Sequence, residues 1–174
     1  MVLVTVRELR LLLGLLLVLF VTSETWRYVG RLTTIRLLLF ALATLTAALL
    51  VVSAGLRRTL AGAAVRRATV RVGGEVIAFG AALFATFTIV GVLSIDAGLV
   101  AEWSGSESGV LASLGVGDPT LVITRQLLHV AAFLAALGAL SFAIEVVADP
   151  GTRDTLISDL VEPEVRDAAA DPTP

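Results

Sequence analysis

Long, nearly unbroken runs of apolar residues alternate with short polar segments along this chain. The runs predict helices at about 9–28, 34–55, 75–99 and 121–147. A helix needs about 20 mainly apolar residues to span the hydrocarbon core of a bilayer. The pattern therefore predicts an all-α integral membrane bundle of four transmembrane helices within residues 1–148. The acidic residues 149–174 are expected to form a largely disordered tail, apart from one short amphipathic helix at 152–161.

The first run fits a bilayer least well, because its purely apolar part is shorter than a span requires. Its helix must continue through Glu24 and end near Trp26 and Tyr28, aromatic residues that favour the headgroup level. Arg7 and Arg10 before an apolar run also match a secretory signal peptide. No small-x-small cleavage site follows, so we expect a retained helix, with a cleaved signal as the alternative.

The polar segments between the runs carry charges of opposite sign. The second and third runs are separated by Arg57, Arg58, Arg66, Arg67 and Arg71. The third and fourth are separated by Asp96, Glu102, Glu107 and Asp118. Because cytoplasmic segments retain Arg and Lys, the arginine segment is predicted to be cytoplasmic, and so are both termini. Arg27 and Arg31, in the first outer connection, oppose this prediction.

Two features of these connections carry further expectations. The arginine segment either binds anionic lipid headgroups or serves only as the topology signal. In the outer connection, residues 108–114 are predicted to form a short helix. Asp118 and Pro119 suit the N-cap and the first turn of the fourth helix.

A stripe of small residues runs along the fourth predicted helix. Ala131, Ala135, Ala139 and Ala143 recur at four-residue spacing. Helices in lipid associate through close packing at small residues, so the stripe is predicted to pack within the bundle. A contact in a homo-oligomer or with other membrane subunits is an alternative, and so is the general abundance of Ala.

Ionisable residues cluster near the predicted outer ends of the helices. They are Glu24, Arg27, Asp96, Arg125 and His129. Such residues are costly within a membrane and are functional candidates for that reason. Arg125 and His129 share one helix face at i,i+4 spacing. The cluster has two interpretations: a proton-carrying site, since the ordinary pKa of His is about 6.5, or a set of pairs that only neutralise one another.

Composition excludes several kinds of chemistry. The chain has no Cys and one His, so neither a usual zinc site nor a bis-histidine haem can form within it. We find no phosphate-binding loop and no nucleophile beside a base, and we expect neither an enzyme nor a cofactor. The net charge of −2 creates no field that attracts nucleic acid. The expected partner is the lipid bilayer, and the expected location is the cell membrane.

The end of the first predicted helix carries a resemblance. The motif Thr22-Ser23-Glu24-Thr25-Trp26 lies between two Leu-rich helices. It resembles an uncharacterised prokaryotic family of putative integral membrane proteins with a Thr-x-Glu-x-Trp motif, a domain of unknown function. The family has a second Trp where Arg27 stands. The resemblance implies a multi-span membrane protein without an assigned activity, and it draws attention to the Glu and Trp of the motif.

These patterns lead to two functional hypotheses. The first is a multi-pass membrane protein with a structural role or an accessory subunit. The second is a small oligomeric transporter or channel that uses the outer polar cluster, since four helices alone rarely enclose a pathway. A cavity containing Glu24, Arg125 and His129 would distinguish the second from the first.

Overall fold

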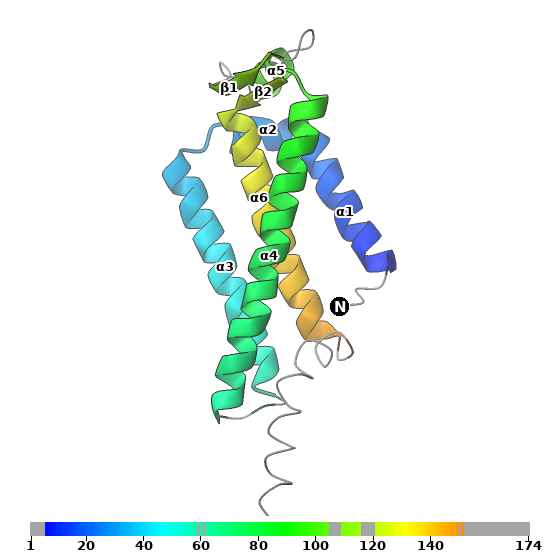
Figure 1. Ribbon diagram of the computed structural model, residues 1–174, viewed down its shortest axis with the longest axis vertical. Coiled ribbons are helices and arrows are strands. Elements are labelled where there is room, and N and C mark those ends of the chain that lie inside the picture. Colours follow the sequence, from blue (N-terminus) through cyan, green and yellow to red (C-terminus); the bar gives the residue numbers. More distant parts are fainter. Residues whose placement is uncertain are drawn as a thin grey trace, which may run out of the picture.

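The computed structural model describes residues 6–58, 60, 62–104, 109–115, 121–149 and 151. Its elements are α1 (Val6–Val21), α2 (Ser23–Val29), α3 (Thr34–Leu56), α4 (Gly62–Ser94), α5 (Ala97–Ser104), β1 (Val110–Leu114), β2 (Leu121–Thr124) and α6 (Arg125–Ala148). In Figure 1, α1, α3, α4 and α6 run along the molecule, while α2, α5 and the strands gather at one end. We call this the hairpin end. The opposite end, where α3 ends and α4 begins, is the arginine end.

Three of these helices are long and apolar enough to cross a membrane: α3, α4 and α6. This confirms a mostly helical chain with helices suited to a bilayer. The 33 residues of α4 extend for about 50 Å, well beyond a hydrocarbon core of about 30 Å. The 16 residues of α1 extend for only about 24 Å.

The single first helix predicted at 9–28 is wrong, because the chain breaks at Thr22. The backbone there is extended, with φ −82° and ψ 119°. Its hydroxyl donates back to the carbonyl of Val18 at 2.6 Å, a bond that competes with regular helix and often bends it. Glu24 in the first turn of α2 favours a new helix start. Trp26 turns inward as a result and is 0% exposed. Its expected position at the headgroup level stays a prediction.

The arginine segment is largely helix rather than loop. We expected the third helix to begin at 75, but α4 begins at Gly62 and carries Arg66, Arg67 and Arg71 in its first turns. Charge ends an apolar run without ending a helix, since Ala and Arg both have high helix propensity. Only Arg57 and Arg58 lie in the turn that follows α3.

The third predicted helix, 75–99, ends early in the structure. α4 ends at Ser94, and α5 is a separate helix that begins at Ala97. Asp96 lies just before α5, and its Oδ1 accepts a hydrogen bond from the N–H of Leu99 at 2.8 Å. A side-chain acceptor at this position satisfies a free N–H of the first turn, and so favours a helix start there.

The connection from α5 to α6 contains the only strands among the described residues. β1 and β2 pair antiparallel, with Ala112 opposite Ile123 and Leu114 opposite Leu121, and a bulge lies between Val110 and Ala112. The helix predicted at 108–114 and the helix start predicted at 121 are therefore wrong, and the all-α class needs this correction. β-branched residues at 122–124 favour the strand. The proposed capping residues Asp118 and Pro119 and most of the acidic tail lie outside the described residues.

Helix α6 lies at the centre of the bundle and contacts α1, α3 and α4. Half of its most apolar stretch is buried, at 50%, against 22% in α3 and in α4. The hairpin end has a core with Phe20, Trp26, Phe87 and Leu127. The arginine end has a second core, which includes Val52, Leu56, Val72, Val76 and Val146.

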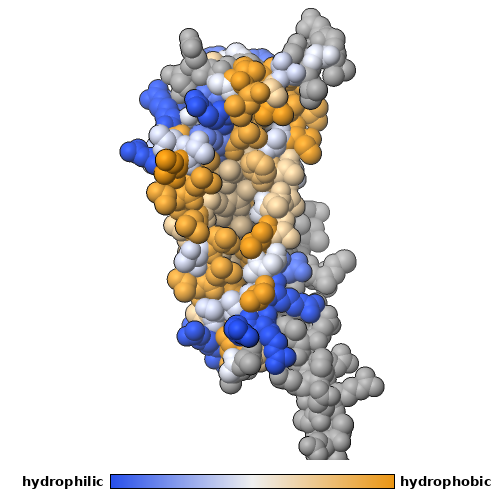
Figure 2. Space-filling view, turned by 60° about the vertical axis from the view of Figure 1, so that its left-hand side comes forward, coloured by the Kyte–Doolittle hydropathy of each residue, from blue (hydrophilic) through white to orange (hydrophobic). Residues whose placement is uncertain are grey.

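Apolar side chains also cover the outside of the bundle. Leu15, Leu38, Leu42, Ile77 and Leu93 are each more than half exposed, and they come from α1, α3 and α4. Figure 2 shows hydrophobic surface along the middle of the molecule, with hydrophilic surface gathered towards both ends. An exposed apolar belt of this kind matches a lipid environment rather than water.

The small-residue stripe of α6 lies in the packed interior. Ala131, Ala135 and Ala143 are buried, and Ala139 is partly buried. A Cβ atom placed on Gly80 of α4 would lie 3.2 Å from the Cβ of Ala139. The backbones of α4 and α6 therefore approach closely at this point, as small residues allow in a membrane bundle.

Candidate functional site

The predicted polar cluster is divided between several local contacts. Glu24 and Arg27 form an ion pair within α2, and both side chains are more than half exposed. The hydrogen bond and the charge of Glu24 raise the pKa of Arg27 above its ordinary value. Together they line an open pocket of about 400 Å³ with Tyr28, Arg31, Leu32 and Arg36. Neither Arg125 nor His129 lines this pocket.

Arg125 begins α6 and faces the hairpin rather than Glu24. Its backbone N–H donates to the carbonyl of Gly109 at 2.8 Å. A Cβ atom placed on Gly109 would lie 3.6 Å from both Nε and Nη2 of Arg125, so the side chain lies along the segment that leads into β1. The guanidinium stays exposed there.

His129 lies one turn further along α6 and is only 6% exposed. Its Nε2 is 3.5 Å from the hydroxyl of Thr34, the first residue of α3. Its Nδ1 is buried and makes no hydrogen bond to the described residues. The backbone of Val29 lies near the ring. The imidazole therefore lies at the contact of α3 and α6, away from solvent.

Two buried polar residues of the hairpin end were missed by the sequence analysis. Gln126 is 1% exposed, and its Oε1 accepts a hydrogen bond from the N–H of Gly109 at 3.1 Å. Thr124 is equally buried, and its hydroxyl accepts from the N–H of Leu127 at 3.1 Å, which caps α6. An uncharged amide does not appear in a search for ionisable residues. The sequence feature that could have revealed this buried residue is a Gln within an otherwise apolar run.

The hairpin end therefore uses its polar groups to hold the chain together. Asp96 caps α5, Gln126 and Thr124 organise the start of α6, and Glu24 neutralises Arg27. Arg125 and His129 share a helix face as predicted by their spacing, but the structure does not bring Glu24 to them. Among the described residues, no group of three or more His, Cys, Asp or Glu side chains could hold a metal ion.

Comparison with known proteins adds nothing to this geometry. No family model matches the chain, no curated protein matches it, and no solved structure matches it. The resemblance of residues 22–26 to a Thr-x-Glu-x-Trp family stays a prediction. Any function must therefore be inferred from the contacts, burial and charges of this chain alone.

Proposed function

We propose that the protein is a multi-pass protein of the cell membrane that crosses the bilayer four times and serves as a structural component or an accessory subunit. The observation that carries this proposal is the use of polar groups at the hairpin end. Gln126 and Thr124 are buried, and each accepts a hydrogen bond from a backbone N–H. The exposed side chains of the long helices, by contrast, are largely apolar.

A fourth crossing is assigned to α1. This helix runs beside the hairpin half of the spanning helices in Figure 1, and its N-terminal end points towards the arginine end. Leu11, Leu15, Leu17 and Val18 are each at least half exposed, as expected for a lipid-facing surface. With α1 counted, the crossings are even in number, and both termini lie on the side of the arginines, which the positive-inside rule places in the cytoplasm.

The absence of Cys makes this topology simple to test. Single cysteines are placed at Thr5, Arg58 and Ser113 and treated with a membrane-impermeant maleimide. In intact cells we expect labelling at Ser113→Cys alone. In inside-out vesicles we expect labelling at the other two positions. Labelling of Thr5→Cys from the same side as Ser113→Cys would contradict the fourth crossing and leave three.

The accessory role is tested by the size of the native assembly. We expect the protein in a mild detergent to migrate as a defined complex larger than its own 18.1 kDa. Migration as a monomer in every mild detergent would contradict an accessory role. Proteoliposomes should show no proton flux beyond that of a His129→Ala control. A flux abolished by that substitution would instead favour the transport hypothesis.

A further inference from the structure

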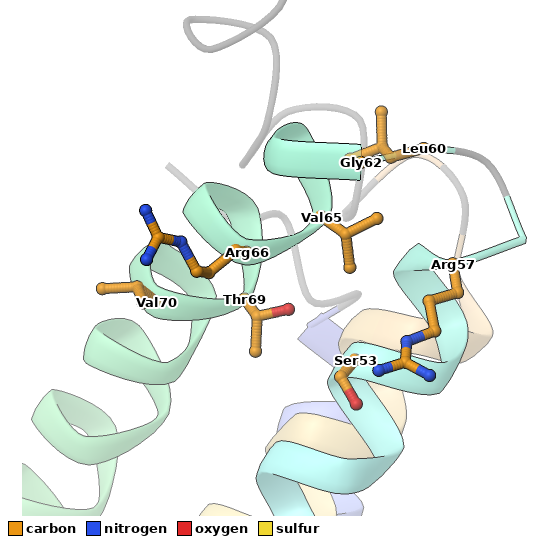
Figure 3. A pocket seen from close by; sticks show the side chains of 8 residues that line it. All are labelled: Ser53, Arg57, Leu60, Gly62, Val65, Arg66, Thr69 and Val70. Carbon is orange, nitrogen blue, oxygen red and sulfur yellow. The ribbon is translucent and has the colours of Figure 1, made fainter.

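The arginine end contains an open groove between the last turn of α3 and the first turns of α4. Its volume is about 610 Å³, and it is lined by Ser53, Arg57, Leu60, Gly62, Val65, Arg66, Thr69 and Val70. Figure 3 shows the Thr69 hydroxyl directed towards α3 and the Arg57 side chain lying along α3 beside Ser53, while the Arg66 side chain points to the opposite side of α4. No carboxylate is among the described residues that line this groove.

The groove carries positive charge without an internal counter-ion. Arg57 and Arg66 are both exposed, and neither makes an ion pair or a side-chain hydrogen bond within the described part of the chain. The N-terminal turn of α4 also faces the groove, and helix N-termini favour anions. Gly62 begins this helix with φ +58°, a conformation that other residues rarely adopt, and it adds no side chain to fill the groove.

Thr69 supplies an unused hydrogen-bond donor on the same wall. Its Oγ1 is buried and has no hydrogen-bond partner among the described residues. Thr44, Thr46 and Thr86, on the same two helices, each donate to the carbonyl four residues earlier, at 2.7–2.8 Å. The Thr69 hydroxyl lacks this usual partner, as the Thr88 hydroxyl of α4 also does. Because Thr69 lines the groove, a rotation of its side chain would bring the hydroxyl to an oxygen of an anion bound beside Arg57.

The surroundings of the groove favour a lipid as the source of that anion. Val70 is 72% exposed on its wall, and Ile77, two turns along the same face of α4, is 54% exposed. Towards the middle of the bundle, α3 and α4 close together at Leu49 and Gly73, where an added Cβ would lie 2.7 Å from the Leu side chain. The groove is thus closed on the side of the bundle centre and continues into exposed apolar surface.

We propose that this groove binds the phosphate of an anionic phospholipid headgroup. Arg57 binds the phosphate, Thr69 donates a hydrogen bond to a phosphate oxygen, and Arg66 adds longer-range attraction from the far side of α4. The acyl chains extend along the exposed apolar face that contains Val70 and Ile77. The proposal rests on the membrane insertion proposed above, but its test uses purified protein and does not depend on the number of crossings.

The test counts lipid adducts on the full chain by native mass spectrometry in a neutral detergent. Phosphatidylglycerol is titrated against phosphatidylcholine, and we expect at least tenfold tighter binding of the anionic lipid. The double variant Arg57→Gln/Arg66→Gln should weaken phosphatidylglycerol binding by about 30-fold, on the usual contribution of two arginines near an anionic surface. Thr69→Val keeps the charge and should weaken binding by about tenfold.

The matched control removes the same charge from the hairpin end. Arg31→Gln/Arg36→Gln, two exposed arginines of the other pocket, should change the affinity by less than about twofold. Equal losses in both double variants, or no loss in Thr69→Val, would overturn the site and leave only general charge attraction. Glycerol 3-phosphate should not compete at millimolar concentration. Competition at the affinity of the lipid would overturn the lipid assignment in favour of a soluble phosphate.

Discussion

The buried hydrogen-bonding side chains of the hairpin end and the groove arginines of the arginine end differ in their contacts. At the hairpin end, Trp26, Thr124 and Gln126 are buried and hydrogen-bonded to the backbone. At the arginine end, Arg57 and Arg66 are exposed beside an open groove, and their side chains make no ion pair or hydrogen bond to the described residues. Polar groups that already have partners stabilise the chain, whereas polar groups without partners remain available to a ligand.

Charge alone ranks the ionisable cluster near the hairpin end above the arginines as a candidate site, and this difference reverses that ranking. The ionisable cluster near the hairpin end has the stronger pattern in sequence, yet Glu24 and Asp96 are engaged in local pairing and capping. The arginines of the arginine end can be explained by membrane topology alone. Because α4 begins early, Arg66 is instead held on a helix across a groove from α3. An arginine that a helix holds in one position can take part in a binding site, whereas a charge on a loop only attracts anions in general.

The largest expected effect is the loss of Trp26, which tests whether the hairpin end is a packed structural unit. Its ring packs edge-on against Phe20 and Trp103, with centroids 5.7 Å and 5.9 Å away, and its Nε1 donates to the carbonyl of Phe20. Trp26→Ala should lower the free energy of unfolding by about 3–5 kcal/mol. The remaining Trp103 reports unfolding of this end by fluorescence. Tyr28→Ala, at a side chain 70% exposed, should have little effect.

A second effect concerns the helix that connects the two ends. Ala135 is 6% exposed and its carbonyl faces Gly80 of α4, so a larger side chain must separate α4 from α6. Ala135→Leu should destabilise the protein by about 1–3 kcal/mol through overpacking. The control is Ala85→Leu, at an exposed position of α4, which should leave the detergent melting temperature unchanged. Equal melting temperatures for Ala135→Leu and Ala85→Leu would show that the small-residue stripe does not contribute to the packing of the bundle.

A third effect isolates one hydrogen bond of the hairpin end. Gln126→Leu retains most of the buried volume but leaves the N–H of Gly109 without its acceptor. Loss of a buried partner costs about 1–3 kcal/mol. Arg125→Gln at the neighbouring exposed position keeps the backbone bond to Gly109 and should cost less than about 0.5 kcal/mol. If Gln126→Leu and Arg125→Gln lower the free energy of unfolding in urea equally, hydrogen bonding does not explain the difference between the two ends.

The smallest expected effect belongs to the arginine end. In a neutral detergent without phospholipid, Arg57→Gln/Arg66→Gln should change stability by less than about 0.5 kcal/mol, because neither side chain bonds to the described part of the chain. Added phosphatidylglycerol should then raise the melting temperature of the unchanged protein more than that of the variant, since a ligand stabilises the state that binds it. A large loss in detergent alone would show that these arginines are structural.

The sequence predicted α3, α4 and α6 as long apolar helices, because apolar runs of sufficient length have few alternatives in a bilayer. It placed the start of α4 thirteen residues late and the start of α6 four residues early. It failed where a local polar contact decides the backbone. The hydroxyl of Thr22 bonds to Val18 and the first helix breaks there; the carboxylate of Asp96 starts a new helix. Residues 122–124 form a strand only because β1 pairs with them across the connection. Such pairings are tertiary, and hydropathy does not report them.

The candidate sites show the same limit. Spacing correctly placed Arg125 and His129 on one face of a helix, but it could not join them to Glu24 on another element. The buried Gln126 was not predicted, because the candidate residues were chosen by their charge and Gln is uncharged. The groove at the arginine end depends on the early start of α4 at Gly62, which the change in hydropathy at residue 75 conceals.

The central place of α6 also has a consequence for biogenesis. α1 packs on α6, and the Leu16 side chain lies against Gly138, yet α6 is the last of the described helices in chain order. α1 therefore cannot pack against α6 until the segments between them have been synthesised. Its long-range docking, rather than insertion, should be the slow event of assembly. Truncated chains that end before α6 should expose α1 to the quality-control proteases of the membrane.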